Sequence, residues 1–227
     1  MPASGRLHTR AAVCYPPPMN EHVRQIGPPL LPATTQAAEG LPRRKWTLAE
    51  IEQLSEQGVF GGVDRERERF ELIGGEIVPM SAKGAFHEDV KRALNRFWVK
   101  ALPPELEALT ETTLRDAPHD FREPDFIFWP ATVSVRDLKP ANVQLLVEIS
   151  DSSLGYDLGP KAAYYASLGL PNYWVIDAKR LVTHIHRQPA DGAYTSVTHY
   201  AYTDQLVPLA LPSLAECLAD LGLPPSA

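Results

Sequence analysis

Residues 145–150 read LLVEIS, an apolar run that carries a single carboxylate, Glu148. A short apolar run of this kind is typical of a buried strand. Because side chains alternate across a strand, Glu148 shares its face with Leu146 and Ser150 and has no charged partner within its own strand. An ionised carboxylate in such surroundings costs free energy unless it is paired. The fold must therefore bring a partner to Glu148 from a neighbouring element.

The preceding half of the chain predicts helices and strands in mixed order. Thr47 and Glu50 have the T-x-x-E spacing of a capping box, which predicts a helix after residue 47. Gly74 and Gly75 separate two strand-like runs and predict a hairpin. In residues 85–101, apolar side chains recur at helical spacing.

The second half continues this mixture. A strand is expected after Pro124, in REPDFIFWP, and a helix over residues 157–168 with Asp157 as its N-cap. Three strand-like runs follow, namely YWVID, LVTHIHR and YTSVTHY, and PSLAECLADLGL predicts a short C-terminal helix. This order predicts a mixed α/β (α+β) domain around one central sheet and not the regular alternation of a doubly wound fold.

The chain is expected to consist of a tail and one domain. Residues 1–42 hold eight of the 22 prolines and show no periodicity, which predicts a disordered N-terminal tail. Residues 43–227 are long enough for one domain with a sizeable core. No run approaches the roughly 18 apolar residues of a membrane span, and the first residues lack a secretory apolar stretch. We therefore expect a cytoplasmic protein without membrane contact.

The net charge of −6 argues against broad, non-specific binding of nucleic acid. Contact with phosphates is driven by Lys and Arg, which are outnumbered here by Asp and Glu. Contact with DNA or RNA would need metal ions or a local positive patch to offset the acidic remainder.

Asp125 is the first expected neighbour of Glu148, because it follows Pro124 at the start of the apolar strand DFIFW. If the two strands are adjacent, their carboxylates lie close together and raise one pKa, unless a cation sits between them. Oxygen-only ligands of this kind suit Mg²⁺ or Mn²⁺. On its own, Asp125 also fits the role of a turn residue at the start of a strand.

Lys161 is the second expected neighbour. In the predicted helix it lines up with Leu158, Tyr165 and Leu168 on the stripe that faces the core. A cation in the first turn opposes the helix dipole by roughly 0.3–1 kcal/mol, so an anion should offset it, either Glu148 or a phosphate. Two other roles remain open for Lys161: a purely structural ion pair with Glu148, or a side chain that extends to solvent.

Asp, Glu and Lys around an oxygen-liganded metal form the set of groups used in metal-assisted phosphodiester hydrolysis. The carboxylates hold the metal, which lowers the pKa of a bound water and neutralises charge on the phosphate. The lysine orients the water or stabilises the phosphate oxygens.

Several blocks of the sequence resemble one known family. The segment VEISDSSLGYDLGPKAAYYASLGLPNYWVID strongly resembles the signature of the Uma-type restriction endonucleases, a family within the PD-(D/E)xK nuclease superfamily. FELIGGEIVPMSAKGAFHEDV and REPDFIF resemble two further blocks of that family, in the same order. The resemblance covers roughly residues 45–215. It implies a restriction-endonuclease-like core, with a central mixed sheet flanked by helices.

The resemblance also implies roles for individual residues. Asp125 matches the metal-binding Asp of the Pro-Asp motif, and Glu148 matches the acidic member of the E-x-K element, another metal ligand. The superfamily usually has a lysine where this chain has Ser150. The family resemblance places that catalytic lysine on the following helix, at Lys161.

Two further positions match the family less specifically. Glu71 matches an acidic position that would complete the metal shell, and His87 matches a histidine at the start of a helix. Tyr165 is expected beside the site or in the core. Glu71 also fits the solvent side of a strand, and His87 also fits a histidine on a helix surface or in the core.

The main hypothesis is a DNA endonuclease that depends on Mg²⁺ or Mn²⁺ and acts through a metal-activated water. The alternative is a catalytically inactive nucleic-acid-binding or regulatory module on the same fold. A metal phosphohydrolase acting on RNA or on small molecules also fits the same residues. Because duplex DNA has a pseudo-two-fold axis, a homodimer is expected.

Overall fold

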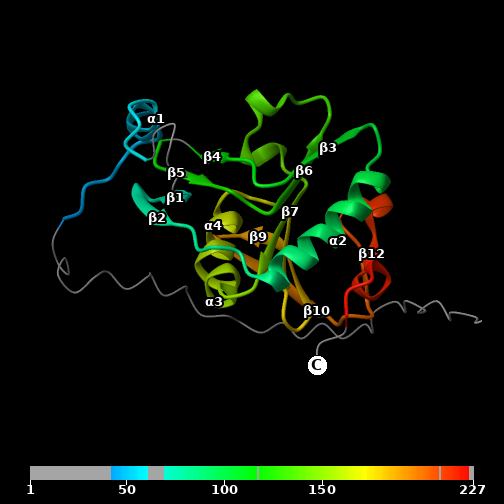
Figure 1. The fold of residues 1–227 in the computed structure, drawn as a ribbon. Coiled ribbons are helices and arrows are strands. Elements are labelled where there is room, and N and C mark those ends of the chain that lie inside the picture. The colour runs from blue at the N-terminus through cyan, green and yellow to red at the C-terminus, as the bar shows by residue number, and fades with distance from the viewer. Residues whose placement is uncertain (1–41, 61–68, 117, 210, 225–227) are drawn as a thin grey trace, which may run out of the picture.

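The computed structural model describes residues 42–60, 69–116, 118–209 and 211–224 (Figure 1). The tail expected over residues 1–42 lies outside these residues, except for its last member. Within them, the chain forms a six-stranded, a four-stranded and a two-stranded sheet, with helices around them. No helix in these residues has the length and apolar character needed to cross a membrane.

A six-stranded sheet forms the centre of the molecule. Its strand order is β10-β9-β8-β7-β6-β3. β7 pairs parallel with β8, and the other neighbours are antiparallel, so the sheet is mixed as expected. The strands are β3 (Leu106–Leu109), β6 (Phe126–Pro130), β7 (Leu145–Ser150), β8 (Asn172–Asp177), β9 (Val182–Ala190) and β10 (Ala193–Tyr200).

A smaller sheet of order β2-β1-β5-β4 lies beside the large one (Figure 1). The predicted hairpin is present, with Gly74 and Gly75 between its two strands. The predicted capping box of Thr47 and Glu50 is also present, at the start of α1. The elements are α1 (Leu48–Glu56), β1 (Phe70–Ile73), β2 (Glu76–Pro79), β4 (Leu114–Asp116) and β5 (Asp120–Arg122).

Gly75 fits this hairpin against the segment that leads into α1. Its φ is +85°, and its carbonyl accepts a 2.8 Å hydrogen bond from the N–H of Trp46. A Cβ at this position would lie 2.7 Å from Cβ of Lys45 and 2.9 Å from its Cα. A residue without a side chain is therefore needed here.

The two faces of the large sheet are covered by different elements. α2 (Ala85–Ala101) and the C-terminal segment pack on the face that carries Leu145, Val147 and Ile149. The helical segment after β7 packs on the opposite face, with Leu146 and Val175. The alternation expected for LLVEIS is therefore observed, and Glu148 points toward the helical segment that carries Lys161.

The helical segment after β7 differs from the prediction. It consists of α3 (Leu154–Tyr156), a π-helical turn η4 (Asp157–Lys161) and α4 (Ala162–Ser167), so it begins three residues early. Asp157 is therefore not the N-cap. Its carboxylate turns back toward β7 and accepts hydrogen bonds from the hydroxyls of Ser150 and Ser153, at 2.8 and 2.5 Å.

The C-terminal helix predicted from PSLAECLADLGL is not formed. The segment folds as two short 3-10 turns around a two-residue strand, β12, which pairs with β11. The leucines of this segment recur at helical spacing, but they contact α2 from short turns and not from one continuous helix. The remaining short elements are η2 (Val135–Asp137), η3 (Pro140–Asn142), β11 (Gln205–Leu206), η5 (Pro212–Leu214), β12 (Glu216–Cys217) and η6 (Leu218–Leu221).

Candidate active site

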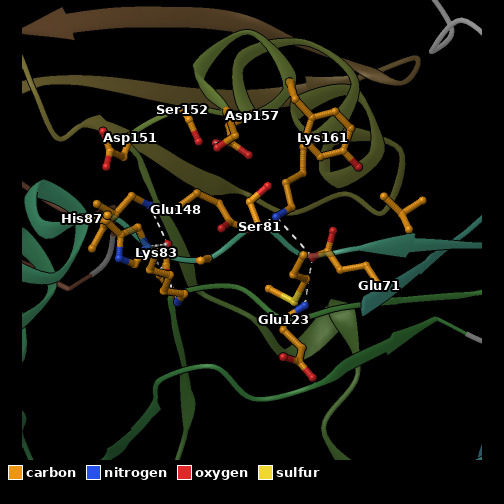
Figure 2. Close-up of a pocket in the computed structure, with 18 of the residues that line it drawn as sticks. Glu71, Ser81, Lys83, His87, Glu123, Glu148, Asp151, Ser152, Asp157 and Lys161 are labelled. Carbon is orange, nitrogen blue, oxygen red and sulfur yellow. Dashed lines mark hydrogen bonds and ion pairs between the residues drawn. The ribbon is translucent and has the colours of Figure 1, made fainter. Parts of the chain in front are cut away.

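A cavity of about 260 Å³ lies between the end of β7, the turn η4, strand β1 and the loop from β2 to α2. Figure 2 shows how its charged side chains converge from these elements. Five of the six residues singled out in the sequence line this cavity: Glu71, His87, Asp125, Glu148 and Lys161. The sixth, Tyr165, is connected to this cavity by a hydrogen bond to Glu148.

Lys161 joins two carboxylates from different sheets. Its ammonium nitrogen lies 2.9 Å from Oε1 of Glu148 and 3.3 Å from Oε1 of Glu71 (Figure 2). The residue is only 7% exposed, so it does not extend into bulk solvent. Of the roles left open for Lys161, extension to solvent is therefore wrong.

Glu148 and Glu71 are each held by a second donor. The Tyr165 hydroxyl donates to Oε1 of Glu148 at 3.0 Å, and the Glu123 N–H donates to Oε1 of Glu71 at 3.2 Å. Both carboxylates are buried, so the solvent-exposed position considered for Glu71 is also wrong. Neither Oε2 receives a hydrogen bond from a described residue.

The local backbone explains how Lys161 reaches the strand. Ser150, which stands where the superfamily has its lysine, donates to Asp157 at the start of η4. This contact ties the helical segment to the end of β7. The wider π-helical turn then carries Lys161 over the Glu148 face, and Tyr165 follows one turn later on the same side. Lys161 therefore reaches Glu148 from the helical segment that lies above the strand.

Negative charge exceeds positive charge around Glu148. Burial raises the pKa of Glu148 to about 8; Lys161 opposes this shift, while Asp125, Asp157 and Glu71 add to it. For Lys161, burial alone would lower the pKa, but Glu148 and Glu71 hold it above its ordinary value. Lys161 therefore remains charged, and the group of carboxylates around it favours additional positive charge.

Asp125 lies next to Glu148 because of strand register. β6 pairs with β7 so that Phe126 lies opposite Val147, and the residue before Phe126 is therefore opposite Glu148. The N–H of Ile149 donates to Oδ2 of Asp125 at 2.8 Å. The expectation that these two strands are adjacent is thus confirmed.

Two cationic or proton-donating side chains also reach Asp125. Nε2 of His87, on the first turn of α2, lies 3.0 Å from both carboxylate oxygens. The ammonium of Lys83 lies 2.6 Å from Oδ1. Burial would raise the pKa of Asp125, but the His87 hydrogen bond and the charge of Lys83 lower it well below its usual range. Asp125 is therefore ionised, and both its oxygens already accept hydrogen bonds.

Lys83 and Glu111 are functional candidates that sequence reasoning missed. The Lys83 ammonium also pairs with Oε1 of Glu111, which receives Lys91 at 2.9 Å and Arg69 at 3.1 Å as well. Burial opposes ionisation of Glu111, but Lys83 and Lys91 lower its pKa to about 2. Lys83 lies in the block MSAKGAFH, yet a lysine in a loop carries no periodic signal.

The donor set fits a metal ion that keeps much of its water shell. Among the described residues, no three His, Cys, Asp or Glu side chains form a preassembled metal cage. Mg²⁺ usually binds one or two carboxylates and retains several waters. Asp125 and Glu148 supply such a pair, and Glu71 is a third carboxylate that lines the same cavity. The residues present therefore suit Mg²⁺ or Mn²⁺ better than a caged metal.

Comparison with known proteins concerns the family and the fold of the chain. The family model Uma2, described as "Putative restriction endonuclease", matches residues 48–222. No curated protein matches the chain significantly. Among solved structures, a putative nuclease belonging to DUF820 from Anabaena variabilis is similar, with a TM-score of 0.53 and 16% identity over 77% of this chain and 96% of that one. At this identity the likeness concerns the fold, and the expected restriction-endonuclease-like architecture is confirmed.

Proposed function

This chain belongs to the Uma2 family, which is described as "Putative restriction endonuclease", and on that premise we propose that it is a Mg²⁺-dependent DNA endonuclease that hydrolyses phosphodiester bonds. One observation carries the proposal. The Lys161 ammonium lies 2.9 Å from Glu148, and Asp125 lies opposite Glu148 on the neighbouring strand. A lysine and two carboxylates thus meet at one cavity, although they come from separate segments.

Asp125 and Glu148 would hold the metal, and Glu71 is the third acidic candidate. When bound, Mg²⁺ or Mn²⁺ would supply Lewis-acid chemistry: it would activate water and stabilise charge on the phosphate. Glu148 offers Oε2, which receives no hydrogen bond from the described residues. Glu71 offers its own Oε2 in the same way, while its Oε1 fixes the position of Lys161.

Lys161 would bind the reacting phosphate. An ammonium has three N–H donors, and that of Lys161 forms ion pairs with two carboxylates, Glu148 and Glu71. Three donors facing two paired anions among the described residues would leave one for an oxygen of the substrate or for the attacking water. Because the two carboxylates keep Lys161 in place, this donor is preorganised for the charge that develops in the transition state.

His87 and Tyr165 would act as positioning residues. His87 bridges both oxygens of Asp125, and the Tyr165 hydroxyl fixes Oε1 of Glu148. Each therefore orients a carboxylate proposed to bind the metal, as outer hydrogen-bonding partners do in metal sites generally.

The direct test is cleavage of supercoiled plasmid DNA by the purified chain in Mg²⁺ or Mn²⁺. Glu148→Gln and Lys161→Met should each reduce cleavage by at least 100-fold. Glu216→Gln is the matched control, since Glu216 is also a buried glutamate but contacts Trp98 away from the cavity. Cleavage that persists in a folded Glu148→Gln protein would overturn the proposal.

The alternative, an inactive nucleic-acid-binding module, is favoured by one observation: both oxygens of Asp125 are already engaged. Such a module would bind DNA without cutting it in either metal. A gel-shift assay beside the plasmid assay separates the two functions. For the active enzyme we propose a homodimer, which light scattering at micromolar concentration would detect.

A further inference from the structure

We propose that Lys83 is an internal counter-ion of this site: its ammonium neutralises Asp125 and leaves it when a divalent cation binds, while keeping its contact with Glu111. The inference rests on the proposed function, because the cation concerned is the one that Asp125 and Glu148 would hold. It goes further by assigning a role to a residue outside the proposed catalytic set.

The position of Lys83 supports the first half of this proposal. Its ammonium lies 2.6 Å from Oδ1 of Asp125, and its side chain is only 17% exposed. Lys83 lies in the loop between β2 and α2, at the rim of the cavity (Figure 2). It therefore places a full positive charge on an oxygen that a metal ion would need.

Among the groups that contact Asp125, Lys83 is the one best able to move. The Ile149 N–H belongs to the backbone of a central strand, and His87 is fixed on the buried side of α2. Lys83, in contrast, lies on a loop, and a flexible stem of four carbons carries its ammonium. A cation arriving at Oδ1 would repel the ammonium, and rotation of the side chain would relieve the repulsion.

Glu111 is the anion with which the Lys83 ammonium can stay paired after it leaves Asp125. It already pairs with Lys83 and also with Arg69 and Lys91, so its carboxylate is fixed from three sides. Its N–H donates to the carbonyl of Pro124, directly before Asp125. Lys83 can therefore leave Asp125 without losing its second anion.

The backbone of Glu111 adds a second indication. Its φ of 53° lies in the left-handed region, which a residue with a side chain adopts at a cost. Such a conformation persists only where the surroundings enforce it. Here it points a carboxylate at Lys83 and keeps the ammonium near Asp125.

The first test is calorimetric titration of Mn²⁺ and Mg²⁺ into the full chain. Lys83→Met should bind Mn²⁺ about tenfold more tightly than the wild type, since no charge has to be displaced. Lys91→Met is the matched control, because Lys91 pairs with the same Glu111 oxygen but not with Asp125. Its affinity should equal that of the wild type. Lys83→Gln repeats the test with a polar side chain if the methionine variant does not fold.

The second test needs no variant. Brief acetylation of the wild-type protein, followed by mass spectrometry, measures the reactivity of each lysine. Mn²⁺ should increase labelling of Lys83 several-fold, because its ammonium is released from Asp125. Lys91 serves as the internal reference and should not change.

The outcomes separate this inference from the proposed function. If the wild type binds Mn²⁺ and Lys83→Met binds equally or more weakly, the counter-ion role is wrong while the nuclease proposal stands. If the wild type does not bind but Lys83→Met binds tightly, Lys83 blocks Asp125 and is not displaced by the cation, which overturns both the release step and the metal-dependent function of the native chain. If neither protein binds, both proposals fail. Unchanged labelling of Lys83 in a protein that binds Mn²⁺ also overturns the inference.

Discussion

The ammonium of Lys161 lies 2.9 Å from Oε1 of Glu148, and both residues are buried on one face of the central sheet. Removing one partner of a buried pair typically costs about 3–5 kcal/mol, and because burial already raises the pKa of Glu148 to about 8, uptake of a proton by Glu148 keeps the cost at the lower end of this range. We expect Lys161→Met to destabilise the protein by about that amount. The double variant Lys161→Met/Glu148→Gln should lose less than the sum of the two single variants, by at least about 1 kcal/mol. Urea unfolding of the four proteins measures this coupling, and additive losses would contradict it.

Tyr165 and Tyr173 allow a matched comparison of two buried hydroxyls. Tyr165 donates to the carboxylate of Glu148, whereas Tyr173 donates to the backbone carbonyl of Asp157. Each Tyr→Phe change should cost about 1 kcal/mol of stability. Only Tyr165→Phe should also lower the rate of plasmid cleavage, by roughly tenfold. Equal cleavage rates in the two variants would show that Tyr165 has no positioning role.

Because of His186, we expect the free energy of unfolding to decrease in acid. It is buried between the rings of Tyr173 and Tyr194, and no described residue hydrogen-bonds its Nδ1. Burial, with a smaller effect of His184, lowers its pKa from 6.5 to about 4. The unfolded chain therefore binds more protons between these two values. Stability is fully present above about pH 6.5 and falls as the pH approaches 4, by at most about 3 kcal/mol from this residue.

His186→Phe should reduce this acid sensitivity, because the ring contacts remain and the titrating group is gone. Thermal unfolding from pH 4 to pH 8 measures the effect. The two proteins should have parallel profiles above pH 7 and diverge below pH 6. Part of the acid sensitivity should persist, since burial also lowers the pKa of His184 to about 4. Identical slopes below pH 6 would contradict the prediction.

Gly74 and Gly75 differ in the space around them, although both have positive φ. A Cβ on Gly74 meets nothing within 4 Å, while one on Gly75 would collide with Lys45. Gly74→Ala should therefore cost only the left-handed penalty of about 1–2 kcal/mol. Gly75→Ala should cost at least about 1 kcal/mol more, because the backbone before α1 must shift. Urea unfolding of both variants checks the difference.

Much of the fold could be predicted from the sequence where local pattern and tertiary packing agree. The LLVEIS strand, the hairpin at Gly74 and Gly75, and the helix over residues 85–101 all form as expected. In each case, the periodic burial of apolar side chains and the local turn or helix preference favour the same structure.

The predictions failed where a tertiary contact of a side chain outweighed the local sequence pattern. Asp157 has the chemistry of an N-cap, but it bonds to Ser150 and Ser153, and the helix starts earlier. The C-terminal leucines have helical spacing, yet packing against α2 selects short turns instead. Such contacts join residues that are distant in the chain or depend on exact register, and no local pattern records them.

The candidate site was predicted in part. The convergence of Asp125, Glu148 and Lys161 was expected from the assumed adjacency of two strands, the helical stripe and the family resemblance, and the structure places all three at one cavity. Lys83 and Glu111 were missed, because the first lies in a loop and the second depends on an unusual backbone angle.

The wide turn that carries Lys161 comes after both Asp125 and Glu148 in the direction of synthesis. A ribosome therefore completes the two acids while the lysine is still missing from the growing polypeptide. Under the proposed function, copies that end before residue 161 would lack the lysine of the site and would not cut DNA. The site would be complete only after residue 161 has been translated and the domain has folded.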